Sequence, residues 1–106
     1  MIRVLIKKKK GNFGEICVFG HAMYDDYGKD IVCAGASTIF ITTVNAILRF
    51  NKQAIDVQQE KDLVCLKILQ TSEIIDILLE NMVDLFLELS SKYPKNITVR
   101  EDEYNE

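Results

Sequence analysis

The stretch that decides the fold is Asp30–Phe50, DIVCAGASTIFITTVNAILRF, which carries no charged side chain from Ile31 to Leu48. The run is long enough to be considered as a membrane span. Several hydroxyl and amide side chains lie within it, however, and these favour a helix buried inside a folded protein over one in a bilayer. Asp30 is a suitable N-cap, so we predict a helix from Ile31 to about Phe50 and no membrane association.

Predicted strands lie on both sides of this helix. Apolar side chains alternate along residues 2–8, and a second strand is predicted over 15–19. The glycines and asparagine between them are turn-forming residues, which predicts a hairpin. After the helix, AIDVQQ (54–59) and LVCLKIL (63–69) are two further strands joined by a turn at EKD.

A second helix is predicted to begin after Ser72 as its N-cap and to end before Pro94. NITVRE (96–101) then suits a short last strand. The element order, strand-strand-helix-strand-strand-helix, predicts an α+β fold with two long helices on a mainly antiparallel sheet of four to five strands. The predicted apolar face of the second helix consists of Ile74, Ile75, Leu78, Met82, Leu85, Phe86 and Leu89.

Composition limits the class of protein. With 106 residues, 48% hydrophobic and 27% charged, the chain is predicted to be one soluble domain spanning residues 1–106. Its net charge of −3 argues against nucleic-acid binding by bulk electrostatics. The basic run follows the first apolar residues, which is the reverse of a signal peptide, so we expect a cytoplasmic protein.

The three cysteines do not form a recognisable pattern. An odd number without a CxxC pair argues against a disulfide framework and a zinc site, so we expect reduced thiols and no metal or other cofactor. Cys17 and Cys65 fall within predicted strands, where packing is their expected role. Cys33 stands apart because it follows the predicted helix start.

Cys33 and His21, the only histidine, are the candidate catalytic pair. If Asp30 caps the helix, Cys33 lies in the first turn, where unpaired amide groups and the helix dipole lower a thiol pKa. The amides of Cys33 and Ala34 could then hold an oxyanion. An imidazolium at His21 would favour the thiolate further. The alternative is that the cysteine and the histidine are only structural.

Other residues of this region could support the pair. Ser37 lies four residues after Cys33 and therefore on the same helix face. Asp30 could orient His21, or it could only cap the helix. The polar loop up to Lys29 could close over a peptide, or it could be a plain surface connection. The loop residues predicted to contact substrate are Ala22, Met23, Tyr24, Tyr27 and Gly28.

Two surfaces suggest partners. Lys7–Lys10 could touch RNA or an acidic partner, although four lysines at a hairpin are more typical of a solvated sheet edge. The negative net charge favours the second interpretation. The first helix is apolar on more than one face. Its surplus apolar surface could pack beneath the second helix or against another subunit, and we favour a homodimer.

Two segments carry a family resemblance. GHA (Gly20–Ala22) follows the second strand and DIVCAGAS (Asp30–Ser37) opens the helix. Together they resemble the ribosomal-processing cysteine protease Prp family of bacteria, and the resemblance extends to the length and element order of the whole chain. One departure is Ala36, where family members commonly have valine, and this bears on substrate fit more than on activity.

The resemblance implies that His21 is the base and Cys33 the nucleophile, with Asp30 and Ser37 in supporting roles. It also implies a dimeric endopeptidase that removes the short N-terminal extension of a large-subunit ribosomal protein (bL27-type), cutting after a hydrophobic segment that contains phenylalanine. The alternative function is a ribosome-associated module that binds protein or RNA through Lys7–Lys10 without catalysis. In that case Cys33→Ser would leave the biological role intact.

Overall fold

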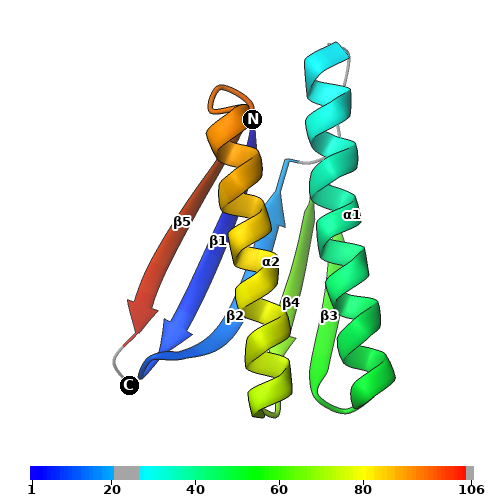
Figure 1. The fold of residues 1–106 in the computed structure, drawn as a ribbon, viewed down its shortest axis with the longest axis vertical. Coiled ribbons are helices and arrows are strands. Elements are labelled where there is room, and N and C mark those ends of the chain that lie inside the picture. Colours follow the sequence, from blue (N-terminus) through cyan, green and yellow to red (C-terminus); the bar gives the residue numbers. More distant parts are fainter. Residues whose placement is uncertain (21–26, 105–106) are drawn as a thin grey trace.

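The computed structural model describes residues 1–20 and 27–104 and contains two layers, a five-stranded sheet and a pair of helices (Figure 1). The predicted α+β class and element order are confirmed. The last strand is present but longer than predicted, since it spans Ile97–Tyr104 and not only 96–101. The elements are β1 (Ile2–Lys9), β2 (Asn12–Phe19), α1 (Tyr27–Phe50), β3 (Ile55–Glu60), β4 (Leu63–Ile68), α2 (Glu73–Lys92) and β5 (Ile97–Tyr104).

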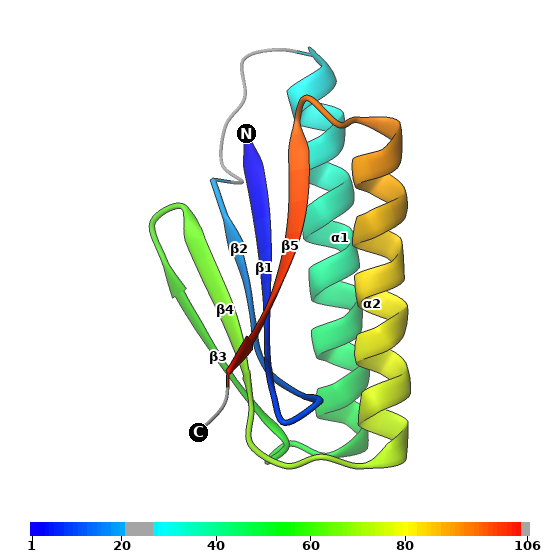
Figure 2. The same ribbon diagram turned by 90° about the vertical axis from the view of Figure 1, so that its left-hand side faces the viewer.

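The strands follow the order β3-β4-β2-β1-β5. All neighbours are antiparallel except β1 and β5, which run parallel. Lys10 and Gly11, both with positive φ, connect β1 to β2, as the two central residues of a tight hairpin turn require. Both helices cover one face of the sheet, and β3 and β4 diverge from α1 toward their shared turn (Figure 2).

Helix α2 closes the core. Ser72 caps it as predicted, because its side-chain oxygen accepts a hydrogen bond of 3.2 Å from the Ile75 N–H. The predicted apolar face is partly wrong, since Ile74 and Leu85 are 48% and 39% exposed. The face that packs on the sheet recurs at intervals of four, three and four residues, and consists of Ile75, Leu79, Met82 and Phe86.

Helix α1 begins at Tyr27, four residues before the predicted start, so Asp30 lies inside the helix and does not cap it. The segment Ile31–Phe50 is long and apolar enough to cross a membrane, a criterion that core helices of soluble proteins also meet. Its buried side chains lie in the hydrophobic core with residues of the sheet and α2, and include Val32, Ala36, Phe40 and Ile47.

The expectation of three reduced thiols is wrong for this structure, which joins Cys17 of β2 to Cys65 of β4 in a disulfide. The two residues are direct partners in the antiparallel register, and their Cα atoms are 4.1 Å apart. Such a short separation is typical of a non-hydrogen-bonded cross-strand pair. Cysteine spacing in the sequence could not reveal it, because the pairing depends on the register between two strands.

Candidate functional site

Cys33 lies in the second turn of α1, half-buried and packed against the hydrophobic core. It takes no part in the disulfide. Because α1 begins at Tyr27, the amides of Cys33 and Ala34 follow the first turn, in which the unpaired N–H groups of a helix lie. The predicted placement of these two amides in the first helical turn is therefore wrong, and their oxyanion role stays a prediction.

The face of α1 that carries Cys33 continues along the helix. Ser37, Phe40 and Val44 follow Cys33 at intervals of four, three and four residues, which places all four on one stripe. The predicted placement of Ser37 on the face of Cys33 follows directly from the helix observed here. This Cys33 stripe (Cys33, Ser37, Phe40 and Val44) runs for about 16 Å along the helix axis.

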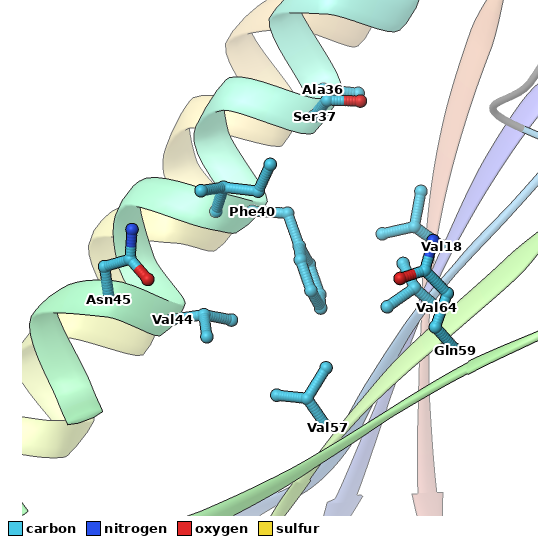
Figure 3. A pocket seen from close by; sticks show the side chains of 10 residues that line it. Val18, Ala36, Ser37, Phe40, Val44, Asn45, Val57, Gln59 and Val64 are labelled. Carbon is cyan, nitrogen blue, oxygen red and sulfur yellow. The ribbon is translucent and has the colours of Figure 1, made fainter. Parts of the chain in front are cut away.

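Three members of the Cys33 stripe line an apolar groove of about 190 Å³ between α1 and the sheet. Figure 3 shows Phe40 pointing from the helix toward the strands, with Val57 and Val64 across from it. The groove lining consists of Ser37, Phe40, Val44, Ala36, Ile41 and Asn45 of α1, Val57 and Gln59 of β3, Val64 of β4 and Val18 of β2. Cys33 lies one helical turn beyond the Ser37 end of this groove.

The sequence prediction missed most of the groove lining. Val57 and Gln59 alternate along β3, so both point to the helix side of the sheet. Their alternation is visible in the sequence, but it does not tell that β3 is an edge strand beside α1. The groove arises because β3 lies at the edge of the sheet and because β3 and β4 diverge from α1 (Figure 2).

Gly20 is the last described residue before His21, the other member of the candidate pair. Its φ of +73° is left-handed, and its N–H donates a 2.8 Å hydrogen bond to the Asp62 carbonyl oxygen in the β3–β4 turn. A Cβ at this position would lie 2.9 Å from the Met1 carbonyl oxygen, so glycine is required. The residue that leads into His21 is thus held against the β3–β4 hairpin.

The remaining predicted site residues are placed only in part. Tyr27 and Gly28, predicted in a loop, form the first turn of α1. Asp30 follows within the helix, and its side chain lies outside the described part of the structure. Residues that lie wholly outside the described chain are His21, Ala22, Met23 and Tyr24.

The basic run at the end of β1 has acidic neighbours. Lys7 pairs with Glu15 at 3.2 Å and Lys8 with Glu101 at 3.8 Å. The Lys8 ammonium also lies 4.8 Å from the centre of the Phe13 ring. These contacts lower the positive potential of the run, which argues against RNA binding. The interpretation as a sheet edge is wrong, however, because β1 lies between β2 and β5.

One group of potential metal ligands occurs among the described residues. Glu15, Cys17 and Cys65 offer ligand atoms within 4.8 Å of one another. Both sulfurs are joined in the disulfide, and the thiolate is the form of cysteine that binds metal. The group therefore provides no cysteine ligand in this state.

Comparison with known proteins gives a consistent result. A stretch of 51 residues is 37% identical to the ribosomal processing cysteine protease Prp of Staphylococcus aureus, and covers 48% of this chain and 48% of that protein. The aligned stretch thus spans about half the length of this curated relative.

Two solved structures match over nearly the whole chain. The essential ribosomal processing protease Prp from S. aureus, in complex with a substrate peptide, has a TM-score of 0.88 and 25% identity over 96% of this chain and 100% of that one. Its complex with a covalently linked product peptide has a TM-score of 0.86 and 26% identity over the same shares of the two chains.

The family relationship rests on the sequence as a whole. The model of the family described as cysteine protease Prp matches residues 1–98, which include every element from β1 to α2. This chain therefore belongs to the cysteine protease Prp family.

Proposed function

We propose that the protein is a cysteine endopeptidase that removes the short N-terminal extension of a bacterial large-subunit ribosomal protein. The observation that carries the proposal is the position of Cys33, on the same helix stripe as the residues that line the apolar groove. The S. aureus relative, which forms a complex with a covalently linked product peptide, supports the same chemistry.

In the proposed reaction His21 accepts the thiol proton of Cys33, and the thiolate attacks the scissile carbonyl carbon. The tetrahedral intermediate collapses to a thioester as the imidazolium gives its proton to the leaving amine. Water, deprotonated by His21, then attacks the thioester, which releases the extension as a free acid and restores the thiol. Asp30 orients the imidazole, Ser37 donates to the substrate, and the chemistry needs no cofactor.

The groove suits the proposed substrate. Its lining is mainly valine, phenylalanine and isoleucine side chains, so it would bind a hydrophobic segment beside the scissile bond. Residues 22–28 would contact the peptide near Cys33. The substrate meets the enzyme in the cytoplasm, where ribosomal proteins are made.

We also propose that the enzyme is a homodimer, as the surplus apolar surface of the helices suggests. Large apolar side chains outside the groove are exposed on both helices, among them Ile31 and Phe50 of α1 and Ile74 and Ile77 of α2. Such side chains gain stability when a second subunit covers them. Sedimentation equilibrium at micromolar concentration would give twice the mass of 12.1 kDa. A single species of 12.1 kDa would contradict the dimer.

The test of the proposed function is cleavage of a synthetic peptide that spans the extension of the host's own ribosomal protein. The unmodified enzyme should cut it once, and Cys33→Ala should lower kcat/KM by at least about a thousandfold. The variant should still bind the peptide. No cleavage by the unmodified enzyme under mildly reducing conditions would contradict the protease function and favour a binding role.

A further inference from the structure

Strand β3 is an edge of the sheet. Among residues 1–20 and 27–104 it pairs only with β4, so its opposite side has no strand beside it. An edge strand presents a row of backbone N–H and C=O groups, and an extended chain can bind to this row as an additional strand. Whether β3 can do so depends on which residues point their backbone groups outward.

The register identifies these residues. The Ala54 carbonyl oxygen accepts a 2.7 Å hydrogen bond from the Leu69 N–H, so Ala54 and Leu69 form a hydrogen-bonded pair. This pair lies next to the pair Ile55–Ile68. Hydrogen-bonded pairs alternate along an antiparallel ladder. The backbone groups of the even-numbered residues therefore face β4. The residues whose N–H and C=O groups point to the open edge are Ile55, Val57 and Gln59.

The pairing of β4 with β2, on its other side, gives the same assignment of backbone directions independently. Cys17 and Cys65 have Cα atoms only 4.1 Å apart, which marks a non-hydrogen-bonded pair between β2 and β4. The backbone of Cys65 must then bond to Gln58, its partner in β3. The backbone N–H and C=O of Gln58 thus point toward β4, and those of Val57 and Gln59 point to the open edge.

Val57 and Gln59 also line the groove with their side chains. A strand added beside β3 would therefore bond to their backbone groups and would point its own alternate side chains at Phe40 and Val44. Figure 3 shows the two valines, Val44 and Val57, facing the same space from the helix and the strand. Edge and groove are thus two parts of one peptide-binding surface.

We propose that the substrate segment beside the scissile bond binds as an additional strand on the β3 edge, bonded to the backbones of Val57 and Gln59. This inference rests on the proposed function and defines how that site reads its substrate. The Cys33 stripe spans about 16 Å, which corresponds to about five residues of extended peptide. Every second residue of that segment places its side chain in the groove.

Charge on the edge favours this occupant over a second copy of the chain. Asp56 and Glu60 lie on β3, and Lys61 and Asp62 follow in the turn, so carboxylates outnumber the one ammonium group. Two such edges brought together would set carboxylates near carboxylates, which destabilises a strand pair. The apolar lining of the groove instead suits the hydrophobic segment that the proposed substrate carries beside the scissile bond.

The first test uses the substrate peptide with one backbone nitrogen methylated at a time. Methylation at a residue whose N–H bonds to β3 should lower kcat/KM by about tenfold or more, because a buried acceptor loses its donor. Methylation at the residues between should change it by less than about twofold. The expected result is therefore an alternating pattern over about five residues, with the same alternation in affinity for Cys33→Ala.

The second test changes the enzyme. Gln59→Pro removes an outward N–H without removing a bond to β4, and proline is tolerated on edge strands. Gln59→Ala loses the same side chain but keeps the N–H, so the ratio of their kcat/KM values isolates the backbone bond. We expect the proline variant to be at least about fivefold less active than the alanine variant. Thermal unfolding of both variants shows that they are folded.

The outcomes separate the two proposals. Cleavage of the unmodified peptide without alternation among the methylated ones, and equal activity of the two Gln59 variants, would overturn strand addition and leave the protease function standing. Absence of any cleavage would overturn both. If Gln59→Pro instead converted a dimer into a monomer, the edge would belong to a second copy and the inference would be wrong.

Discussion

The two sides of the helical layer differ in how they meet the sheet. Under α2 the side chains of Leu79, Met82 and Phe86 are completely buried, and the layers are in full contact. Beside α1 the sheet diverges, Val57 of β3 remains 38% exposed, and a groove of about 190 Å³ lies between the layers (Figure 2). Both helices contribute side chains to the core, but only α1 also borders an open groove, one helical turn from Cys33.

The largest expected effect on stability is on the closed side. Phe86→Ala removes a ring that is 0% exposed and should lower the free energy of unfolding by about 3–5 kcal/mol. Activity per folded molecule should stay close to that of the unmodified enzyme, because Phe86 does not line the groove. Urea unfolding and peptide cleavage measure the two quantities.

Phe86→Leu provides the matched control for a variant that does not fold. It keeps most of the apolar volume and should cost less than Phe86→Ala, about 1–2 kcal/mol. A larger loss of kcat/KM than of stability in either variant would show that the closed side also shapes the site, and the contrast between the helices would not hold.

The disulfide supports the open side. It joins Cys17 and Cys65 across a sequence separation of 48 residues, and removing such a bond typically costs about 2–4 kcal/mol. We expect reduction, or the double change Cys17→Ala and Cys65→Ala, to lower the free energy of unfolding by this amount. The β3–β4 hairpin should then be less firmly held to β2, so KM should rise more than kcat falls.

Mass spectrometry checks the disulfide directly. Alkylation with iodoacetamide in urea should modify one cysteine, Cys33, before reduction and all three afterwards. Three modified cysteines without a reductant would show that Cys17 and Cys65 are thiols in solution. Their removal should in that case change stability only as a change in packing does, by less than about 1.5 kcal/mol.

Much of the fold can be predicted from the sequence, although the contrast between the two sides cannot. The hairpin, the Ser72 cap and both long helices follow from local patterns, because turn residues, caps and periodicity act within a few residues. The start of α1 was misplaced, since Asp30 resembles a good cap although the helix has already begun at Tyr27. The exposed Ile74 was misplaced too, because an apolar stripe has no sharp edge in sequence.

The candidate site also has a part that local sequence predicts and a part that only the fold reveals. Cys33 and Ser37 share a helix face, which spacing alone predicts. The groove lining on β3 and the Cys17–Cys65 bond depend on sheet order and register, which are set by contacts between distant segments. No local signal carries that information, so residues such as Val57 and Gln59 could not be found before the fold was known.

A smaller effect on stability is expected at Gly20, which follows the end of β2. Gly20→Ala places a residue at a φ of +73° and a Cβ 2.9 Å from the Met1 carbonyl oxygen. The left-handed conformation alone costs about 1–2 kcal/mol, and the backbone must also shift. Because His21 follows directly, we expect kcat to fall as well as stability.

Gly11→Ala is the matched control for this change. Gly11 has a similar φ of +81°, but a Cβ there would meet nothing within 4 Å. It should lose about the same 1–2 kcal/mol of stability while kcat stays unchanged. Equal effects of the two variants on kcat would show that Gly20 is only a turn residue and does not position His21.

The smallest effect on stability is expected at Val57, on the open side. Val57→Ala removes two methyl groups that are partly solvated, so unfolding should change by less than about 1 kcal/mol. In the complex the same methyl groups would be covered by the substrate, and kcat/KM should therefore fall by about three- to tenfold. Val57→Thr keeps the shape but adds a hydroxyl, and it should lower kcat/KM for an apolar substrate at least as much. A substitution that costs the free enzyme little and the complex more is the expected behaviour of a surface left open for a ligand. If stability and kcat/KM instead changed by the same free energy, Val57 would be ordinary core, and the difference between the two sides would be one of packing alone.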